Sequence, residues 1–497
     1  MNLSPSFEDL AAWEDLNILV SDAEDDDPSD PRRLDPRQLP PDLVEIDKSI
    51  ADLEAQLEEL KLKRSRLLDE RALISRLPPE IMSRIFELGV DESLELLPVL
   101  SLVSHRWRNI AMACPTLWTY IVLDSDWGWR VPAFLRKVRA HLQRSQASKL
   151  FVDIDFRYVE GFVDAQVIMA ELKPHLSRCY SFTVSVPDWA RMRIVQEHAS
   201  ELGPALEDLY LRIDASESEV EDPFCVLTQA CPRLTHVMLE HAPLECVGVP
   251  MPSLRQLYLL RDHRCHSSSR IAYPFKGLMS IVTTSPLKWL NIRSAVFTLD
   301  STEEVFKAAP TLSELPLLTG ISFDVVDSAS ISLFLESTSL PALSLLSVNS
   351  GDDIHWLTRI ALSPQRYPSL RLLDLRNFNF NGVGLAPFVR ALHHLPQLTG
   401  LGLTSPSSGV VGSRLFEVLA AGPDTMGEWL LPRLEALCIQ NCPDVSGHEL
   451  LRVVTSRRGA AAAQVAKISY LKISQCYLLD PEALERLTAL VETVRTL

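Results

Sequence analysis

Histidine and cysteine, the residue types most able to do metal or nucleophilic chemistry, occur along this chain without the spacing that either chemistry needs. Two short clusters contain potential metal ligands, DHRCH at 262–266 and CIQNC at 438–442. A zinc site takes about four ligands in a fixed arrangement, and no further His or Cys pair lies nearby. We expect DHRCH to form a solvated loop, and we expect Cys438 and Cys442 to occupy strand and turn positions of a repeat.

Sequence motifs of enzymes give no support for catalysis. The chain lacks the phosphate-binding GxxxxGK[ST] loop, the GxSxG nucleophile elbow and the HExxH zinc motif. No motif pairs a cysteine with a general base. We therefore expect no catalytic residue, no metal and no cofactor.

A second set of residues suits binding better than catalysis. Tyr, Trp and Arg often anchor protein interfaces, and here they recur between the leucines of a repeated pattern such as PSLRQLYL at 252–259. The candidates for binding a protein substrate are Tyr210, Arg212, Tyr258, Trp289, Arg293, Asp374, Arg376 and Tyr470. His236, Met238, Glu240, Asn291, Gln440 and Lys472 share the same pattern positions. In the alternative interpretation this row only faces solvent, and a partner contacts loops or ends.

The pattern that positions these residues is LxxLxL, usually preceded by proline. Ten copies recur at intervals of 20 to 36 residues, starting at 204, 232, 252, 285, 310, 341, 368, 396, 432 and 466. Two weaker copies end at 151–154 and 182–185. Repeats of this period indicate a solenoid.

The last two apolar residues of each copy alternate along a short strand and point to one side. One strand cannot bury that row alone, whereas a parallel stack of strands can. The intervening segments are long enough for a returning helix. We expect helices at 223–231, 302–310, 385–395, 413–422 and 481–494. The pattern resembles an α/β leucine-rich-repeat solenoid over residues 130–497, with parallel strands on the concave face and helices outside.

Two different segments precede the repeats. Residues 1–40 hold eleven acidic residues against three arginines, and we expect an acidic, disordered tail. Residues 41–76 favour a helix with a heptad stripe. This stripe either forms a coiled coil, through which the chain could dimerise over 42–76, or packs a lone helix on its own domain. The stripe consists of Leu43, Ile46, Ile50, Leu53, Leu57, Leu60 and Leu67.

Residues 77–123 predict a compact unit of three short helices. Pro78 and Pro79 suit the first turn of a helix, Glu80 favours the positive end of its dipole, and Ser104 is placed to cap a later helix. A unit of this size buries little apolar area by itself. We therefore expect one of its apolar faces to dock on another part of the chain or on another protein.

This unit resembles the F-box family through LPPEIMSRIF (77–86), LSLVSHRWRNIA (100–111) and CPTLWTYIVL (114–123). The resemblance implies that the trihelical unit binds a Skp-type adaptor, which joins it to a cullin ligase. By position, it assigns adaptor binding to Leu77, Pro78, Glu80, Ile81, Ile85, Phe86, Leu100, Val103 and Trp107. In the alternative interpretation these helices only cap the open end of the solenoid.

The resemblance implies a substrate-recognition subunit of a Skp-cullin-F-box ubiquitin ligase. The alternative is a leucine-rich-repeat scaffold or regulatory protein that acts without a ligase.

The basic segment 130–145 carries the apolar stripe Phe134, Leu135, Val138 and Leu142. We expect that stripe to lie in the core with the arginines on the wet face, although the arginines could instead dock an acidic adaptor.

Composition restricts the partners and the compartment. The net charge of −17 over 497 residues argues against nucleic acid and anionic membranes, which are bound by surplus Lys and Arg. No window has the apolar length of a bilayer span. The nine cysteines are odd in number, scattered and not preceded by a signal segment, so we expect reduced thiols and a location in the cytoplasm or nucleus.

Overall fold

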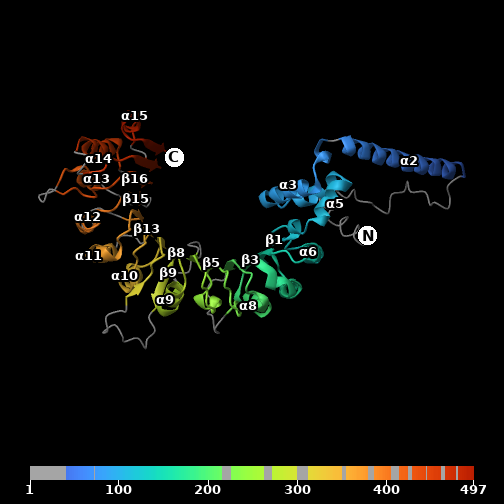
Figure 1. The fold of residues 1–497 in the computed structure, drawn as a ribbon, viewed down its shortest axis with the longest axis horizontal. Coiled ribbons are helices and arrows are strands. Elements are labelled where there is room, and N and C mark those ends of the chain that lie inside the picture. Colours follow the sequence, from blue (N-terminus) through green and yellow to red (C-terminus); the bar gives the residue numbers. More distant parts are fainter. Residues whose placement is uncertain are drawn as a thin grey trace, which may run out of the picture. The chain divides into compact units, whose positions relative to one another are not determined.

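The computed structural model describes most of the chain after residue 40 (Figure 1). The described residues divide into two compact units, Met1–Leu150 and Phe151–Leu497, which are taken here one at a time. The predicted tail at 1–40, loop at 262–266 and helix at 302–310 lie outside the described residues. These are 41–71, 73–214, 225–261, 271–298, 312–349, 354–378, 385–404, 413–423, 428–443, 445–460, 465–476 and 479–496.

The first unit is mainly helical. In chain order its elements are α2 (Pro41–Arg71), η2 (Leu73–Arg76), α3 (Pro79–Glu92), α4 (Leu96–Val103), α5 (His105–Ala113), η3 (Pro115–Trp118), β1 (Tyr120–Leu123) and α6 (Val131–Arg144). Helix α3 begins at Pro79, as the paired prolines predict. The Ser104 hydroxyl accepts a hydrogen bond from the Trp107 N–H at 3.3 Å and so caps α5, also as predicted.

Helices α3, α4 and α5 share one small core with η3. The Trp118 indole N–H reaches across this core and donates to the Ala111 carbonyl at 2.9 Å. The core consists of Met82, Phe86, Val90, Leu97, Leu100, Ile110, Ala111, Cys114, Leu117 and Trp118.

Helix α6 packs against η3 and β1 within the first unit. Phe134, Val138 and Leu142 are buried, as the stripe predicts. Not every cation lies on the wet face, however, because the Lys137 ammonium lies 4.4 Å from the Trp127 ring centroid. The Arg144 guanidinium likewise lies 4.4 Å from the ring of Trp118. The compact-unit boundary at Leu150 groups this helix with the unit before it rather than with the repeats.

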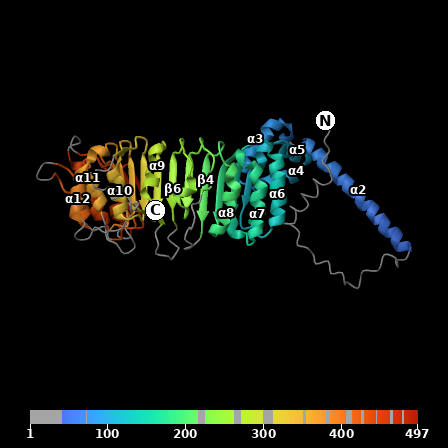
Figure 2. The ribbon, with the colours of Figure 1, turned by 90° about the horizontal axis from the view of Figure 1, so that it is seen from below.

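The second unit is built on one long parallel sheet, whose neighbouring strands run in the same direction (Figure 2). Nearly every strand pairs with the next sheet strand along the chain, as a stack of repeats requires. From the start of the unit the strand order is β2 (Leu150–Asp155), β3 (Cys179–Val186), β4 (Asp208–Ile213), β5 (His236–Glu240), β6 (Gln256–Leu260), β8 (Trp289–Arg293), β11 (Gly320–Asp324), β13 (Leu345–Asn349), β14 (Leu372–Arg376), β15 (Gly400–Thr404), β16 (Ala436–Gln440), β17 (Tyr470–Ser474) and β18 (Thr493–Thr496).

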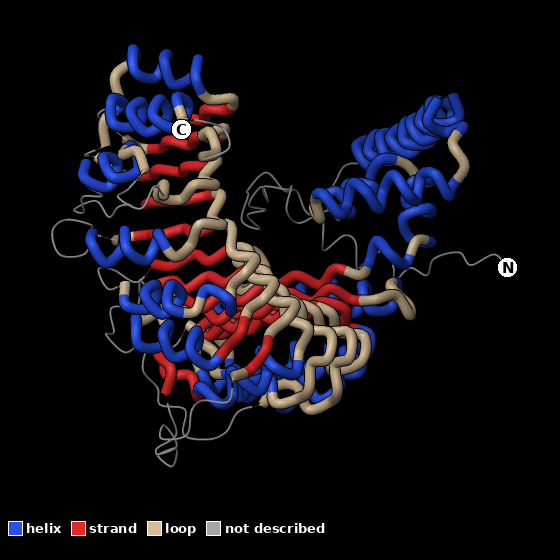
Figure 3. Tube along the Cα trace, turned by 60° about the vertical axis from the view of Figure 1, so that its left-hand side comes forward, coloured by secondary structure: helices blue, strands red, loops and turns tan. Residues whose placement is uncertain are grey.

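The helices of this unit lie on one side of the sheet, and within the described residues of the unit the other side carries none (Figure 3). They are α7 (Phe162–Leu172), α8 (Trp189–His198), α9 (Phe275–Thr284), α10 (Ser328–Ser337), α11 (His355–Leu362), α12 (Leu385–His393), α13 (Ser413–Ala420), α14 (Gly447–Gly459) and α15 (Pro481–Leu490). Short turns of 3-10 helix are η4 (Phe156–Tyr158), η5 (Lys173–Arg178), η6 (Ala199–Glu201), η7 (Leu244–Val247) and η9 (Pro364–Arg366). None of the helices in the described residues is long and apolar enough to span a bilayer.

The parallel sheet and the helices that cover one side of it confirm the leucine-rich-repeat solenoid predicted from the sequence.

Each repeat is joined to the next by the backbone just before its strand. The residue preceding the strand offers a carbonyl that accepts two N–H groups of the following repeat. Lys288, for example, accepts from Thr319 at 2.9 Å and from Gly320 at 3.1 Å. The first leucine of each pattern is buried beneath this point, as Leu343 and Leu370 are. The proline and the first leucine of each pattern copy therefore fix where the strand of that repeat begins.

The residue after the strand takes a left-handed backbone conformation in several repeats. Val325, for example, has φ 56°, and its N–H donates to the Asn349 carbonyl at 2.5 Å. Non-glycine residues rarely adopt this conformation. It turns the chain so that the next residue points into the core, where Val326, Phe378 and Cys442 are buried. The other left-handed residues at this position are His241, Ser294, Asn377, Asn441 and Gln475.

Three sequence predictions about elements are wrong in detail. The repeat copy placed at 310–317 is out of register, because the sheet strand is β11, which follows the second proline, Pro316. The short strand β10 (Ser313–Glu314) instead pairs with β12 (Thr338–Ser339) outside the main sheet.

Apart from these predictions, a second small sheet pairs β7 (Ile271–Pro274) with β9 (Ala295–Thr298).

The described part of the helix predicted at 223–231 is irregular rather than helical. The N–H groups of Val226 and Leu227 donate to the Cys246 carbonyl, which takes them out of any helical ladder. The helix predicted at 481–494 ends at Leu490, and its last residues belong to strand β18. The β-branched residues Val491, Thr493 and Val494 favour that extended end.

Val325 offers a test of the repeated turn. We expect Val325→Asn to raise the free energy of unfolding by up to about 1 kcal/mol, because a β-branched residue is strained at positive φ and asparagine tolerates it. Denaturant unfolding measures the change. The control Val326→Asn should lower stability, since it places an amide in the core. A loss of stability in Val325→Asn would contradict the assigned turn.

His141 makes the first unit sensitive to acid. Its ring packs edge-on against Trp118, with centroids 5.2 Å apart. Burial, followed by the nearby Lys137 and Arg144 cations, lowers the pKa of His141 to about 3. Below about pH 6.5 the His141 side chain takes up a proton in the unfolded chain but stays neutral in the folded unit. The free energy of unfolding therefore falls by about 1.4 kcal/mol per pH unit as pH decreases from about 6.5 toward 3.

His141→Phe keeps an edge-on ring and removes this titration. Unfolding midpoints of the first unit, followed by tryptophan fluorescence from pH 7 to pH 5, should fall less steeply in the variant than in the parent chain. Equal slopes would show that His141 is not buried in its neutral form.

Candidate protein-binding surfaces

Helix α3 presents apolar side chains on two faces. Met82, Phe86 and Val90 point into the core of the first unit. Ile81, Ile85 and Leu88 follow at the same helical spacing on the opposite side and keep 50%, 46% and 53% of their surface exposed. Such an apolar stripe on an otherwise folded helix is typical of a contact surface for another polypeptide.

Helix α4 repeats this arrangement over a shorter length. Leu97 and Leu100 are buried, whereas Val99, Leu102 and Val103 are half exposed or more. The residues assigned to adaptor binding from the sequence do not include Leu88, Val99 or Leu102. A signal for the α4 pair was present, because the run LLPVLSLV is apolar on every face and one core can cover only part of it.

The structure separates the residues assigned to adaptor binding into two groups. Ile81, Ile85 and Val103 present exposed apolar side chains, and Pro78 and Glu80 are also exposed. The remaining residues are partly or fully covered within the unit; they are Leu77, Phe86, Leu100 and Trp107.

The covered group fixes the geometry of the exposed one. The rings of Phe86 and Trp107 pack in a tilted arrangement with centroids 4.9 Å apart, which ties α3 to α5. The Arg106 guanidinium donates to the Leu77 carbonyl at 2.6 Å and holds the chain just before α3. Phe86 and Leu100 thus support the exposed stripe from beneath rather than forming part of the surface.

A polar clamp holds α3 against η3. The Glu87 carboxylate accepts hydrogen bonds from the Thr116 hydroxyl at 2.6 Å and from Arg84 at 2.9 Å. The bond from Thr116 contributes most to lowering the pKa of Glu87 below its ordinary value. A carboxylate kept ionised in this way fixes the rotation of α3, and hence the direction of its exposed stripe.

The second candidate surface is the helix-free side of the long sheet. Neighbouring strands align residue by residue, so their outward side chains form rows. Tyr210, Tyr258 and Asp374 lie in the middle row with Met238, Asn291 and Lys472. Trp289 and Tyr470 lie where strands begin, and Arg212, Arg293 and Arg376 lie where strands end. The predicted row therefore exists, but it spreads over three lines of the sheet.

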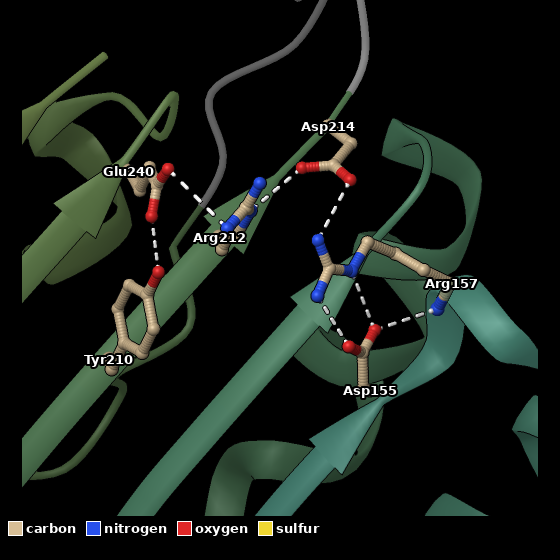
Figure 4. A network of polar contacts seen from close by, with 6 residues as sticks. All are labelled: Asp155, Arg157, Tyr210, Arg212, Asp214 and Glu240. Atoms are coloured by element: carbon tan, nitrogen blue, oxygen red, sulfur yellow. Dashed lines mark hydrogen bonds and ion pairs between the residues drawn. The ribbon is translucent and has the colours of Figure 1, made fainter. Parts of the chain in front are cut away.

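A charged network connects the end row to the preceding repeats (Figure 4). Arg157 donates to Asp155 at 2.8 Å and to Asp214 at 3.2 Å. Arg212 donates to the other oxygen of Asp214 at 2.8 Å and lies 3.6 Å from Glu240, which also accepts a hydrogen bond from the Tyr210 hydroxyl.

The electrostatics of this network hold every group in place. Burial, and then the hydrogen bond to Glu240, raise the pKa of Tyr210 well above its ordinary value. Burial would raise the pKa of Asp214, but Arg212 and Arg157 outweigh it and lower that pKa. The cluster holds three carboxylates against two guanidinium groups, so it favours partner groups that donate hydrogen bonds.

The other predicted arginines are also paired. Arg293 donates to Asp324 at 2.8 Å, and Asp324 accepts a further bond from the Asn349 amide at 2.6 Å. Arg376 donates to Asp374 at 2.9 Å within the same strand. Sequence reasoning listed Asp374 and Glu240 but did not pair them with Arg376 and Arg212. It missed Asp324, because the copy predicted at 310–317 was out of register and only the observed pairing of β8 with β11 sets Asp324 beside Arg293.

Trp289 stands out among the aromatic residues of the face. Its ring lies over Gly320 of the neighbouring strand, so a Cβ at position 320 would come within 2.1 Å of the ring atom Cζ3. The glycine supplies the space that lets a large ring lie flat and partly exposed on the sheet. The structure does not bring Trp289 together with Tyr470, which lies several strands away on β17.

The cysteine cluster occupies the repeat positions that the sequence predicts. Cys438 lies on strand β16, and the buried Cys442 lies in the turn after it, with its thiol 3.2 Å from the Gln440 carbonyl. Over the described residues, no group of three or more His, Cys, Asp or Glu side chains is arranged to hold a metal ion.

Comparisons with known proteins agree with the first unit most directly. Residues 74–124 match the family described as F-box-like. Curated protein sequences give no match. Among solved structures, an internalin from Listeria monocytogenes is similar at 12% sequence identity and a TM-score of 0.32, over 76% of this chain and 95% of the internalin chain. This chain thus carries an F-box-like domain followed by a leucine-rich-repeat solenoid.

Proposed function

We propose that this chain is the substrate-recognition subunit of a Skp-cullin-F-box ubiquitin ligase. The observation that carries the proposal is the coincidence of the F-box-like match with an exposed apolar stripe on the first helix of that domain. The stripe consists of Ile81, Ile85 and Leu88, with Ile85 at its centre. An adaptor groove that covered them would bury apolar area now in water, which is the main driving force of such contacts.

The repeat unit would hold the protein substrate. Its helix-free sheet face presents Trp289, Tyr258 and Tyr470 among hydrogen-bonding groups, and aromatic residues often dominate binding energy. The chain would contribute no catalytic residue, metal or cofactor. By tethering the substrate near a ubiquitin-loaded enzyme, it would raise the effective concentration of the attacking lysine. We place this activity in the cytoplasm or nucleus, where cullin ligases and reduced thiols are expected.

Adaptor binding can be tested on Ile85. We expect Ile85→Asp in the full chain to weaken capture of a purified Skp-type adaptor at least about 30-fold, the loss expected when an interface anchor worth about 2 kcal/mol is replaced by a charge. Binding is measured by titration with the adaptor. Phe86 is unsuitable for this test, since its burial means that substitution would unfold the domain.

Leu362→Asp is the control, because Leu362 is an apolar residue on α11 of the other unit that is even more exposed than Ile85, at 68% against 46%. It should leave adaptor binding unchanged. A parent chain that does not bind the adaptor, or an Ile85→Asp variant that binds as well as the parent, would favour the scaffold alternative.

The substrate surface can be tested by affinity capture from cells with the proteasome blocked. We expect Trp289→Ala with Arg293→Ala to reduce the captured substrate about tenfold or more, because the pair removes a ring and a hydrogen-bonding cation from the sheet face. The double control Arg359→Ala with Leu362→Ala removes a cation and an exposed apolar side chain from the helical side. Equal capture by all three chains would place substrate binding on loops or ends instead.

A further inference from the structure

Helix α2 carries an apolar stripe that nothing in the described chain covers. It runs unbroken from Pro41 to Arg71 (Figure 2). All seven stripe residues, from Leu43 to Leu67, keep between 41% and 64% of their surface exposed. The helix does not pack this stripe on its own domain, which was one of the two interpretations of the sequence. An isolated helix gains little stability in water, so a covered stripe is the more stable state.

The stripe has the spacing of a two-stranded coiled coil. With Leu43 at position a of the heptad, Ile50 and Leu57 also fall at a, and Ile46, Leu53, Leu60 and Leu67 fall at d. It extends over 24 residue steps, or about 36 Å of helix at 1.5 Å per residue. A second helix with the same spacing would cover it along its whole length.

Charge is strongly segregated along α2. Between Leu43 and Glu59 the helix carries six carboxylates against Lys48 alone, and these are Glu45, Asp47, Asp52, Glu54, Glu58 and Glu59. The next turn carries three cations, Lys61, Lys63 and Arg64. Two copies side by side in parallel would place acid beside acid and base beside base. Two antiparallel copies centred between Leu53 and Leu57 place Glu45 and Asp47 of each beside the basic turn of the other, whereas the carboxylates from Asp52 to Glu59 stay beside those of the other copy.

Arg64 favours the same orientation. It falls at an a position, where a parallel pair would bring it against Arg64 of the second copy. In an antiparallel pair centred between Leu53 and Leu57, Arg64 instead faces Ile46, which Glu45 and Asp47 flank. The guanidinium can then reach those carboxylates while its aliphatic stem covers the isoleucine.

We propose that α2 mediates an antiparallel dimer of this chain. In the register that the stripe defines, Leu43 packs against Leu67 of the second copy, Ile50 against Leu60, and Leu53 against Leu57. Asp47 pairs with Lys61 at both ends by symmetry. Glu54 meets Glu54 of the second copy near the twofold axis, so one like-charge contact opposes the pairing.

The orientation can be tested by zero-length cross-linking of the full chain. A carbodiimide joins a carboxylate directly to an amine with loss of water. Asp47 and Lys61 are 14 residues apart on one rigid helix, or about 21 Å, so they cannot be joined within a chain. We expect a peptide linking Asp47 to Lys61 in the dimer band. Its absence, with other α2 cross-links present, would overturn the antiparallel register.

A charge exchange tests the pairing in solution. Light scattering of the full chain should give twice the mass of one chain, and Leu53→Asp with Leu57→Asp should give the mass of one. Asp47→Lys should raise the dimer dissociation constant about fivefold, since two attractive contacts become repulsive. Asp47→Lys with Lys61→Asp should restore it, because those positions meet only in the antiparallel pair.

Two matched variants complete the test. Asp52→Lys makes the same charge change at an outward c position and should affect dimerisation less than Asp47→Lys does. Glu54→Gln should strengthen the dimer about twofold by removing the like-charge contact at the axis. A parent chain that stays monomeric, or a charge exchange that does not restore dimerisation, would overturn the proposal whether or not the chain binds an adaptor.

Discussion

The second unit depends on one constraint, which is that a short strand cannot bury its own apolar row. Each strand is completed by the next repeat, whose N–H groups reach back to the carbonyl preceding that strand, as Thr319 and Gly320 reach Lys288. This joint sets the register, and the register decides which residues face the helices. With leucines fixed inward, alternate residues must face the helix-free side. The candidate binding face is therefore a consequence of the packing of the repeats.

The same register explains why the charges on that face are paired before any ligand arrives. Residues at equal pattern positions lie about 4.8 Å apart on neighbouring strands, so opposite charges at equal positions of adjacent repeats come within reach of each other. Arg212 meets Glu240 and Arg293 meets Asp324. Paired guanidinium groups keep fixed positions but lose much of their attraction for an acidic ligand. Recognition on this face then depends more on shape and on aromatic residues such as Trp289.

Sequence periodicity predicted the solenoid, most of its strands and the three helices of the first unit, because leucine spacing and proline positions act locally. It failed where two prolines competed for one strand start, at 310–317, and where a segment bonded to a distant carbonyl, at 225–231. It also could not tell that Phe86 faces inward while Ile85 faces outward. Adjacent apolar residues on a helix differ only by rotation, and tertiary packing sets that rotation.

Apolar stripes therefore have different consequences in the two units. In the repeats, the complement of each stripe is the next stretch of the same chain, and burial is nearly complete, as for Leu346 and Leu373. On α3 and α2 the stripes stay exposed within the described structure, as the proposed adaptor contact and the proposed dimer both require. Asp47 and Lys61 of α2 match each other in reverse, which suits a second copy. The short stripe on α3 has no charge pattern of that kind, which suits a preformed groove on a different protein.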